Sequence, residues 1–488
     1  MIAFALLLAA TSGSAPVPAS DPAWPALERL CSAGLTGEPC PEIRPLPRAR
    51  LAAMVRFARD LHADLPDALA DSLAQLTHEF LADDAPLVTT RVRTFISDAR
   101  PVLLDRGTAA RVGEERGNEG FVPSRAAARL DARAFTLAGP FALAATAALT
   151  AHDAADSAIL EPPPLARAAG VARLTLPDAT LSAILGNVAL TAGRQSISWG
   201  AATRGNLLFT DASGGLDLVD VAFHSRFFSA IANAIRLEDS RGHPFVFAQR
   251  VSVSPTSFFT LAAQRGILCC ENTAGIRAAD IPTIFLATRE NIPGDRLDFD
   301  QIATVSASAS LPRAASLALH GLGARAWWEY GGTDLYGLDD VKKRGGFPHL
   351  LVASNVAGAF LAAGPVTFTG EYARIGKRPV DFYGNDRYPQ GWSWHGLGVG
   401  HPAGGRGAST LVAATLSLGA GRELGARLID ERYDRGLSTQ SSRRRAGFTW
   451  AMPIHTAQLT ALVESIEQEG PAENLHGAEA TLALRWER

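Results

Sequence analysis

The chain has 488 residues and a mass of 51.4 kDa, enough for two or three ordinary domains or one very large one. Hydrophobic residues make up 47% and charged residues 19% of the sequence, which excludes a disordered or acidic-tail protein. The formal net charge of −3 argues against a broad nucleic-acid-binding surface, so no nucleic acid partner is expected.

Four cysteines are too few for a disulfide scaffold of this length. Cys31 and Cys40 are close enough to bridge a small loop, and Cys269 and Cys270 are adjacent. Whether either pair forms a disulfide stays open at this stage. Neither pair is a CxxC and no Cys/His spacing is typical of zinc, so we expect no metal and no cofactor.

Residues 1–19 begin with MIAFALLLAA and continue with small residues. This pattern predicts a secretory signal peptide, with a buried N-terminal helix as the alternative. Residues 20–125 are then expected to form a small helical bundle and a linker. Apolar residues recur at helical spacing from Trp24 to Leu35, from Leu51 to Leu61 and from Ala68 to Phe80, and 106–120 is polar and Gly-rich.

From 126 to 488 the apolar period changes from helical to two. Segment 366–372 alternates Val, Phe and Tyr with Thr and Glu, and 318–330 alternates likewise. Segment 134–151 has no charged residue, but Gly139–Pro140 interrupts it, so we expect a hairpin and not a membrane helix. Such strands have one apolar and one polar face, as in a half-buried sheet or in a transmembrane barrel.

The lengths of the connections favour the barrel. About sixteen alternating runs can be marked across about 360 residues without linkers, whereas a sandwich of that size would normally divide into several domains. Short turns, such as Gly364–Pro365, alternate with long irregular stretches at 271–300, 331–347, 376–409 and 434–445. Short turns at one end and long loops at the other are typical of outer-membrane barrels.

Three local patterns resemble the Wzi family of capsule assembly proteins, and the likeness spans nearly the whole mature chain. The first is the helix, Pro-rich turn and helix of 24–55. The second is the Trp-Gly pair at Trp199–Gly200 followed by LLFTDA, and the third is the aromatic and Gly-rich stretch 388–408 that leads to Gly400–His401. The sequence has Gly-Gly-Leu-Asp where that family often has a Pro-rich stretch, and Trp where its third pattern often has Tyr.

The resemblance implies an all-β transmembrane barrel of about eighteen antiparallel strands with a periplasmic α-helical bundle. It implies a non-catalytic outer-membrane lectin of a Gram-negative cell that binds capsular or extracellular polysaccharide and helps to attach or assemble it at the surface. The partners expected are that polysaccharide, outer-membrane lipid and lipopolysaccharide. A monomer is expected, because a closed barrel has no free edge.

Two clusters are candidate polysaccharide sites, because sugars need flat apolar faces together with hydrogen-bonding groups. The first lies in the long stretch before residue 409, where the alternative is an aromatic girdle at the membrane interface. The second lies in the stretch after the strand that ends at Trp199, where the alternative is a structural plug with satisfied polar groups. The candidates are Tyr388, Trp392, Trp394, His395, His401 and Arg406 in the first cluster, and Trp199, Arg204, Asn206 and Asp211 in the second.

Charged residues on the strands are expected to face the lumen and to form a structural ion network. They are Arg325, Glu329, Glu371, Arg374, Arg427 and Glu431.

Enzyme and channel functions are the alternatives. The sequence has no G-x-S-x-G, H-E-x-x-H or P-loop motif, so no catalytic residue is expected. His224 and Ser225 vaguely resemble a barrel phospholipase, but neighbouring strand residues point to opposite faces. A porin-like channel for sugars or small solutes is the second hypothesis, and it requires an open lumen.

Overall fold

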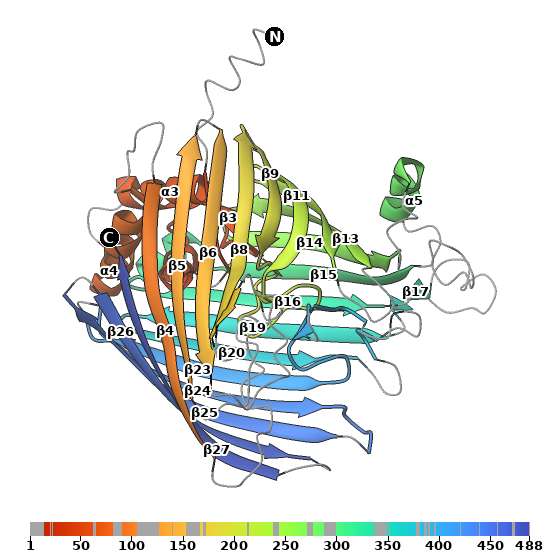
Figure 1. Ribbon diagram of the computed structural model, residues 1–488. Coiled ribbons are helices and arrows are strands. Elements are labelled where there is room, and N and C mark those ends of the chain that lie inside the picture. Colours follow the sequence, from red (N-terminus) through yellow and green to blue (C-terminus); the bar gives the residue numbers. More distant parts are fainter. Residues whose placement is uncertain are drawn as a thin grey trace.

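The structure is a computed structural model of the chain (Figure 1). It describes residues 14–19, 21, 23–61, 65–81, 90–104, 126–138, 140–152, 166–168, 172–211, 214–237, 244–270, 277–286, 299–333, 335–336, 349–350, 352–376, 381–384, 388, 391–394, 397–419, 421–438, 440–455, 457–470 and 474–487. Residues 1–13 of the predicted signal peptide and the polar, Gly-rich stretch 106–120 therefore lie outside the described residues.

Three helices precede the sheet: α2 (Ala23–Ser32), α3 (Arg48–Leu61) and α4 (Asp67–Leu81). The carboxylate of Asp21 accepts the Ala23 N–H at 3.0 Å and caps the start of α2. Helices α3 and α4 each bury one apolar stripe, as their spacing predicts, whereas α2 is buried on almost all sides. Short helical turns follow later, at η3 (Ala278–Asp280), α5 (Ile281–Leu286) and α6 (Arg313–Ala318). Among the described residues, none of the helices has the length and apolar character needed to cross a membrane.

Antiparallel strands pair in sequence order around a closed ring in which β27 returns to β4 (Figure 1). The ring consists of β4 (Thr90–Leu104), β5 (Ala126–Ala138), β6 (Phe141–His152), β8 (Ala172–Leu185), β9 (Val188–Gln195), β11 (Leu216–His224), β12 (Phe228–Arg236), β13 (Phe245–Thr256), β14 (Phe259–Cys269), β15 (Asp300–Ser310), β16 (Gly323–Gly332), β19 (Ala353–Ala363), β20 (Val366–Arg374), β23 (Ala408–Ser417), β24 (Glu423–Tyr433), β25 (Ser441–Ile454), β26 (Ala457–Glu469) and β27 (Asn474–Glu487). The short strand β7 (Ala166–Ala168) adds to β8.

Four two-stranded pairs lie apart from the ring. They are β1 (Pro16–Val17) with β3 (Leu46–Pro47), β2 (Ile43–Arg44) with β10 (Ser198–Trp199), β17 (Leu335–Tyr336) with β18 (His349–Leu350), and β21 (Ser393–Trp394) with β22 (Leu397–Gly398).

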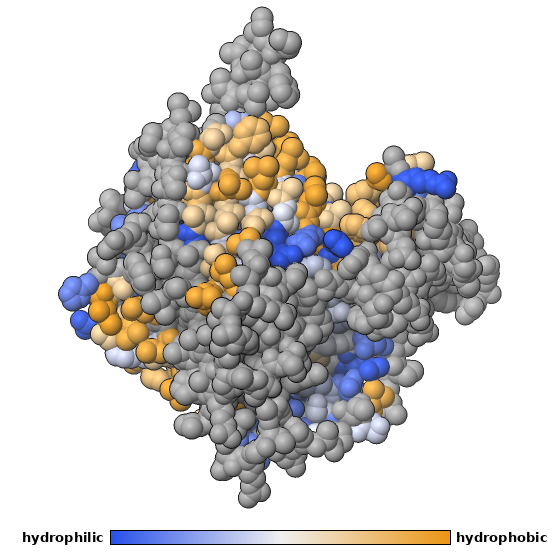
Figure 2. Space-filling view, viewed as in Figure 1, coloured by the Kyte–Doolittle hydropathy of each residue, from blue (hydrophilic) through white to orange (hydrophobic). Residues whose placement is uncertain are grey.

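The strands carry the predicted period of two. On β11, Val219, Val221 and Phe223 are exposed, whereas Leu218 and Ala222, at the alternate positions, are buried. The outer face is therefore apolar, and Figure 2 shows hydrophobic residues gathered over the region of β6, β8 and β9. The inner face is buried although many of its residues are polar, which is the pattern of a membrane barrel and not of a protein with a dry apolar core.

Two boundaries differ from the sequence prediction. The ring already includes β4, which the sequence analysis assigned to the bundle and linker that end at residue 125. The alternation of β4 is obscured by Pro101 and by a register shift between Ser97 and Ala99, so its sequence does not stand out as a strand. The alternating run predicted from 318 begins as a strand only at Gly323, because α6 and a turn occupy the preceding residues. The hairpin predicted at Gly139–Pro140 is present as β5 and β6.

The helices pack into one end of the barrel and not beside it. Strands at this end are joined by short connections, and the long connections lie at the opposite end, near α5 (Figure 1). Glu28 of α2 binds Arg325 of β16 at 3.0 Å, and Glu42, just before β2, pairs with Arg250 of β13. One hydrophobic cluster joins side chains of the three helices, the barrel wall and the loops inside it. The helical part and the barrel thus share a core.

Candidate functional site

The second predicted cluster lies on the connection between β9 and β11, which folds into the lumen. We call residues 196–211 of this connection the plug loop. Within it β10 pairs with β2 of the N-terminal part, with Trp199 opposite Ile43, and the Gly200 N–H donates to the Glu42 carbonyl oxygen at 2.7 Å. The plug loop is therefore held from the helical end of the barrel.

Three carboxylates from the barrel wall hold the tip of the plug loop. Glu371 of β20 accepts the backbone N–H groups of Thr203 at 2.6 Å and Arg204 at 3.1 Å. Glu329 of β16 accepts the Leu207 N–H at 3.0 Å. Glu431 of β24 accepts two guanidinium N–H groups of Arg204, at 2.6 and 3.2 Å. Since these bonds satisfy backbone donors that would otherwise be buried without partners, they fix the loop's position.

Trp199 and Asn206 are buried inside the plug loop. The Trp199 ring meets the edge of Phe209 with centroids 5.0 Å apart, and only 1% of each of Trp199 and Asn206 is exposed. The Asn206 side chain accepts the Ala202 N–H at 3.1 Å and donates to the Ser198 hydroxyl at 2.9 Å. Both side chains thus serve the internal packing of the plug, which was the structural alternative for this cluster.

The first predicted cluster lies on the connection between β20 and β23, and it packs against the plug loop. We call its described residues between 381 and 407 the second loop. The Tyr383 hydroxyl donates to the Leu207 carbonyl at 2.7 Å and accepts the His401 N–H at 2.8 Å. The Thr210 N–H donates to the Val399 carbonyl at 2.9 Å. The structure therefore brings the two predicted clusters together into one body inside the barrel.

Burial changes the protonation of the second loop. Desolvation, with a smaller contribution from the Arg204 charge, lowers the pKa of His401 to about 3, so its imidazole is neutral at pH 7. Its Nδ1 accepts the Ala403 N–H at 3.1 Å, which places the ring proton on Nε2. Burial also raises the pKa of the Tyr383 hydroxyl well above its usual range, so that hydroxyl stays protonated.

Trp392 and Trp394 are buried, with 1% and 3% of their surfaces exposed. The Trp392 indole N–H donates to Asp300 at 2.6 Å, and the Trp394 ring lies 5.9 Å from the guanidinium of Arg194. The Trp392 ring packs on Gly266, an inward position of β14, so the predicted alternative of an aromatic girdle does not describe Trp392. Neither ring presents an open face to a sugar in this arrangement.

The remaining candidates divide by exposure. Tyr388 is buried, and Asp211 is half-buried at the end of the plug loop. Arg406 is half-buried and binds Asp434 at 2.9 Å and Asp381 at 3.6 Å. His395 lies outside the described residues. Arg406 and Asp211 are thus partly exposed at the protein surface.

The predicted ion network in the lumen is present, with one correction. Glu464 pairs with Arg427 at 2.8 Å and also with Arg445, and Glu431 pairs with Arg443 at 3.1 Å as well as with Arg204. The prediction that Arg374 faces the lumen is wrong. Its side chain is exposed and has the same outward direction as those of Val366, Phe368 and Tyr372. Glu371, three residues earlier on the same strand, faces inward, so a spacing of three separates the two faces.

Sequence reasoning missed the polar residues that complete the lumen contacts. Gln264 donates to Glu329 at 2.7 Å, and Arg250 donates to Gln264 at 2.7 Å and to Glu42. Gln264 occupies an inward position of β14 next to the exposed Ala263, and Arg250 occupies an inward position of β13 next to the exposed Val251. The signal available in the sequence was a long polar side chain at a position that the period of two assigns to the inner face of the barrel.

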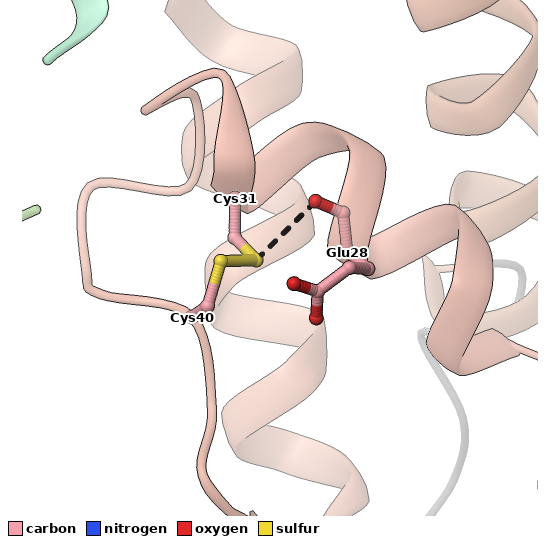
Figure 3. Close-up of side chains that lie close together, drawn as sticks. All are labelled: Glu28, Cys31 and Cys40. Atoms are coloured by element: carbon pink, nitrogen blue, oxygen red, sulfur yellow. Dashed lines mark hydrogen bonds between the residues drawn. A yellow bond between two sulfur atoms is a disulfide. The ribbon is translucent and has the colours of Figure 1, made fainter. Parts of the chain in front are cut away.

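The cysteines bear on whether a metal can bind. Cys31 and Cys40 form a disulfide, and so do Cys269 and Cys270. Figure 3 shows the one group of at least three Cys, His or acidic residues whose ligand atoms come within 4.8 Å of one another in the described part of the chain: Glu28, Cys31 and Cys40. Its two sulfurs are bonded to each other, so they offer no thiolate to a metal. The Cys31 sulfur instead contacts the Glu28 carbonyl oxygen at 3.6 Å.

His224 and Ser225 do not form a nucleophile and base pair. The Ser225 hydroxyl bonds to the backbone of Phe228 within the turn between β11 and β12. The His224 Nδ1 is buried without a hydrogen bond among the described residues.

Comparison with solved structures finds the same fold. Wzi from Escherichia coli, described as an outer-membrane protein involved in group 1 capsule assembly and as a carbohydrate-binding β-barrel, matches with a TM-score of 0.67 and 13% sequence identity. The match covers 97% of this chain and 99% of that one. OpdL from Pseudomonas aeruginosa has a TM-score of 0.47 and 13% identity over 83% of this chain and 99% of its own. OccAB2 from Acinetobacter baumannii has a TM-score of 0.49 and 9% identity over 82% and 98%.

Comparison with protein-family models and with curated proteins finds no match. The resemblance predicted from the sequence patterns is confirmed at the level of the fold: this chain has the fold of an outer-membrane β-barrel and is similar to Wzi over almost its entire length.

Proposed function

We propose that the chain is an outer-membrane barrel of eighteen strands, with its helical part on the periplasmic side, that holds surface polysaccharide without catalysing a reaction. The observation that carries this proposal is the packing of the helices and two loops inside the barrel. The helices, the plug loop and the second loop share one hydrophobic cluster with the barrel wall. A channel needs an aqueous path through the lumen, and a protein that retains a polymer does not.

The extracellular ends of the loops are the proposed contact surface for the polysaccharide. Arg406, with Asp381 and Asp434 beside it, offers hydrogen-bonding groups to sugar hydroxyls. Asp211 adds an acceptor at the end of the plug loop. The buried rings of Trp199, Trp392 and Trp394 support this surface from below in this proposal. The structural likeness to a carbohydrate-binding barrel supports the choice of a glycan as the ligand.

A deletion strain tests the retention of polysaccharide. Cell-bound polymer and polymer in the culture supernatant are quantified in the wild type and in the deletion strain. The proposal expects the total to stay constant while polymer moves into the supernatant. Unchanged amounts in both fractions contradict it. Complementation with Arg406→Gln is expected to restore retention only in part, whereas His455→Gln, an exposed turn residue at the helical end of the barrel, restores it fully.

A bilayer conductance trace separates the proposal from the channel alternative. Wild-type protein is expected to give no steady large openings, because the helices, the plug loop and the second loop pack against the barrel wall inside it. Steady openings that saturate with sugar would instead favour a porin-like channel.

A further inference from the structure

Three charged residues form one row across neighbouring strands at the long-loop end of the barrel. Arg194 of β9 pairs in register with Asp217 of β11, and Asp217 pairs with Arg236 of β12. Residues in register across adjacent strands project to the same face. Two guanidinium N–H groups of Arg194 donate to the two Asp217 oxygens at 2.6 and 2.9 Å.

The row projects outward and not into the lumen. Asp217 is two and four residues from Val219 and Val221, which are 57% and 47% exposed, and Arg194 is four residues from Leu190, which is 40% exposed. Even spacing along a strand keeps the same face. The row thus continues the apolar outer face, and in Figure 2 a band of hydrophilic residues borders the hydrophobic area there.

A groove of about 520 Å³ lies beside this row. The charged row forms part of its wall, and apolar side chains of four strands form the rest. These apolar side chains are Leu176, Ala179, Val219, Ala234 and Phe245. The groove therefore combines a positively charged end with an apolar surface.

The position of the row along the barrel axis suits a lipid headgroup. Phe223 and Phe228, whose rings are 6.0 Å apart, mark the opposite end of the same strands. Six residues of strand separate Phe223 from Asp217, roughly 20 Å at about 3.3 Å per residue. Arg194, Asp217 and Arg236 each lie within two residues of the long-loop end of their strand, so the row lies towards the membrane interface, where a lipid-facing charge costs least.

The charges favour a phosphate. Two guanidinium groups face one carboxylate, which leaves one positive charge in excess, and guanidinium groups bind phosphate oxygens in a fixed fork geometry. Asp217 and the Trp394 ring, 5.9 Å from the Arg194 guanidinium, hold Arg194 in place. Arg236 is exposed at the other end of the row. A free phosphate ion would contact only the charged row, whereas a phosphorylated lipid would also cover the apolar wall of the groove.

We propose that this groove binds a phosphorylated lipid of the outer leaflet, with Arg194 and Arg236 on its phosphate and Val219, Ala234 and Phe245 against an acyl chain. The proposal rests on the outer-membrane location proposed above. It does not require that the protein bind polysaccharide.

Native mass spectrometry of the full-length protein in a non-ionic detergent tests the proposal. The probes are bisphosphorylated lipid A and the same lipid with its phosphates removed. Wild type is expected to retain the bisphosphorylated lipid at least tenfold better. R194Q/R236Q is expected to lose that preference. R236Q serves as a second variant, because it leaves the Arg194–Asp217 pair intact and is expected to fold as the wild type does. Its retention of the bisphosphorylated lipid is expected to fall several-fold.

The control is Arg374→Gln, an exposed outward arginine at the long-loop end of β20. Equal retention of both lipids by wild type, or an equal loss in Arg374→Gln and R194Q/R236Q, overturns the proposal. Heat-shifted gel migration shows that each variant is folded. Because the probe is a lipid, a failure here leaves the polysaccharide experiment unaffected, and fractionation of wild-type cells tests the membrane location separately.

Discussion

The Tyr383 hydroxyl lies 2.7 Å from the carbonyl oxygen of Leu207, although 176 residues separate the two in sequence. This bond ties the second loop to the plug loop. The same hydroxyl accepts the His401 N–H, so one phenol satisfies two backbone groups on two segments. The two candidate clusters are therefore coupled, and a change in one is expected to affect the other.

Tyr383→Phe is expected to destabilise this body. It removes the hydroxyl and leaves the Leu207 carbonyl and the His401 N–H without that partner, which typically costs about 1–3 kcal/mol. Thermal unfolding followed by near-UV circular dichroism measures the loss. Tyr372→Phe is the matched control, because the Tyr372 ring lies on the outer face and is 51% exposed. An equal shift in Tm for both variants would contradict the coupling.

Glu329→Gln combined with Glu371→Gln is expected to loosen the plug loop. The two carboxylates accept backbone N–H groups of Thr203, Arg204 and Leu207, and a neutral amide is a weaker acceptor. Bilayer recordings are expected to show openings more frequent than those of the wild type. Glu467→Gln, which changes an exposed outward residue of β26, serves as control. Recordings of the double variant that match those of Glu467→Gln would mean that other contacts hold the plug.

Glu431→Gln is expected to be the most destabilising change in the ion network. Glu431 is fully buried and faces Arg204 at 2.6 Å and Arg443 at 3.1 Å. Removing one partner of a buried pair costs about 3–5 kcal/mol. The free energy of unfolding in urea is compared with that of Asp430→Asn, the neighbouring outward residue, whose pair with Arg444 is partly exposed. That control is expected to change stability by less than about 1 kcal/mol, and equal effects would refute the argument.

Much of the fold could be predicted because the relevant signals are local. The period of two, the Gly-Pro turns and the long connections each depend on a few neighbouring residues, and they sufficed for the barrel. The inward direction of Glu371 and Glu431 followed from the same period, whereas the outward direction of Arg374 was missed because residues three apart were assigned to one face.

The arrangement inside the lumen could not be predicted, because it depends on contacts between distant segments. Nothing near Trp392 in sequence indicates that its indole reaches Asp300. Nothing near Glu42 indicates that it binds Arg250 of the barrel wall. An exposed aromatic in a binding loop and a buried one in a plug have the same residue type and similar neighbours. Only the fold separates them.

Protonation of His401 is expected to contribute to the pH dependence of stability. This residue lies on the second loop and not on a strand. Its pKa in the folded protein is lowered to about 3 by burial, whereas in the unfolded chain it is about 6.5. Between these two values the unfolded chain binds a proton that the folded protein does not bind. Stability therefore falls as the pH falls from about 6.5 towards 3, by up to about 1.4 kcal/mol per pH unit.

His401→Asn isolates this contribution from that of the buried carboxylates. Asparagine stays neutral and offers an oxygen near the position of Nδ1, which accepts the Ala403 N–H in the wild type. The difference in unfolding free energy between wild type and His401→Asn is expected to be constant above about pH 7.5. Below about pH 6 the wild type is expected to lose stability relative to the variant. A difference that stays constant from pH 8 to pH 4 would mean that the imidazole is protonated in the folded state at an ordinary pKa.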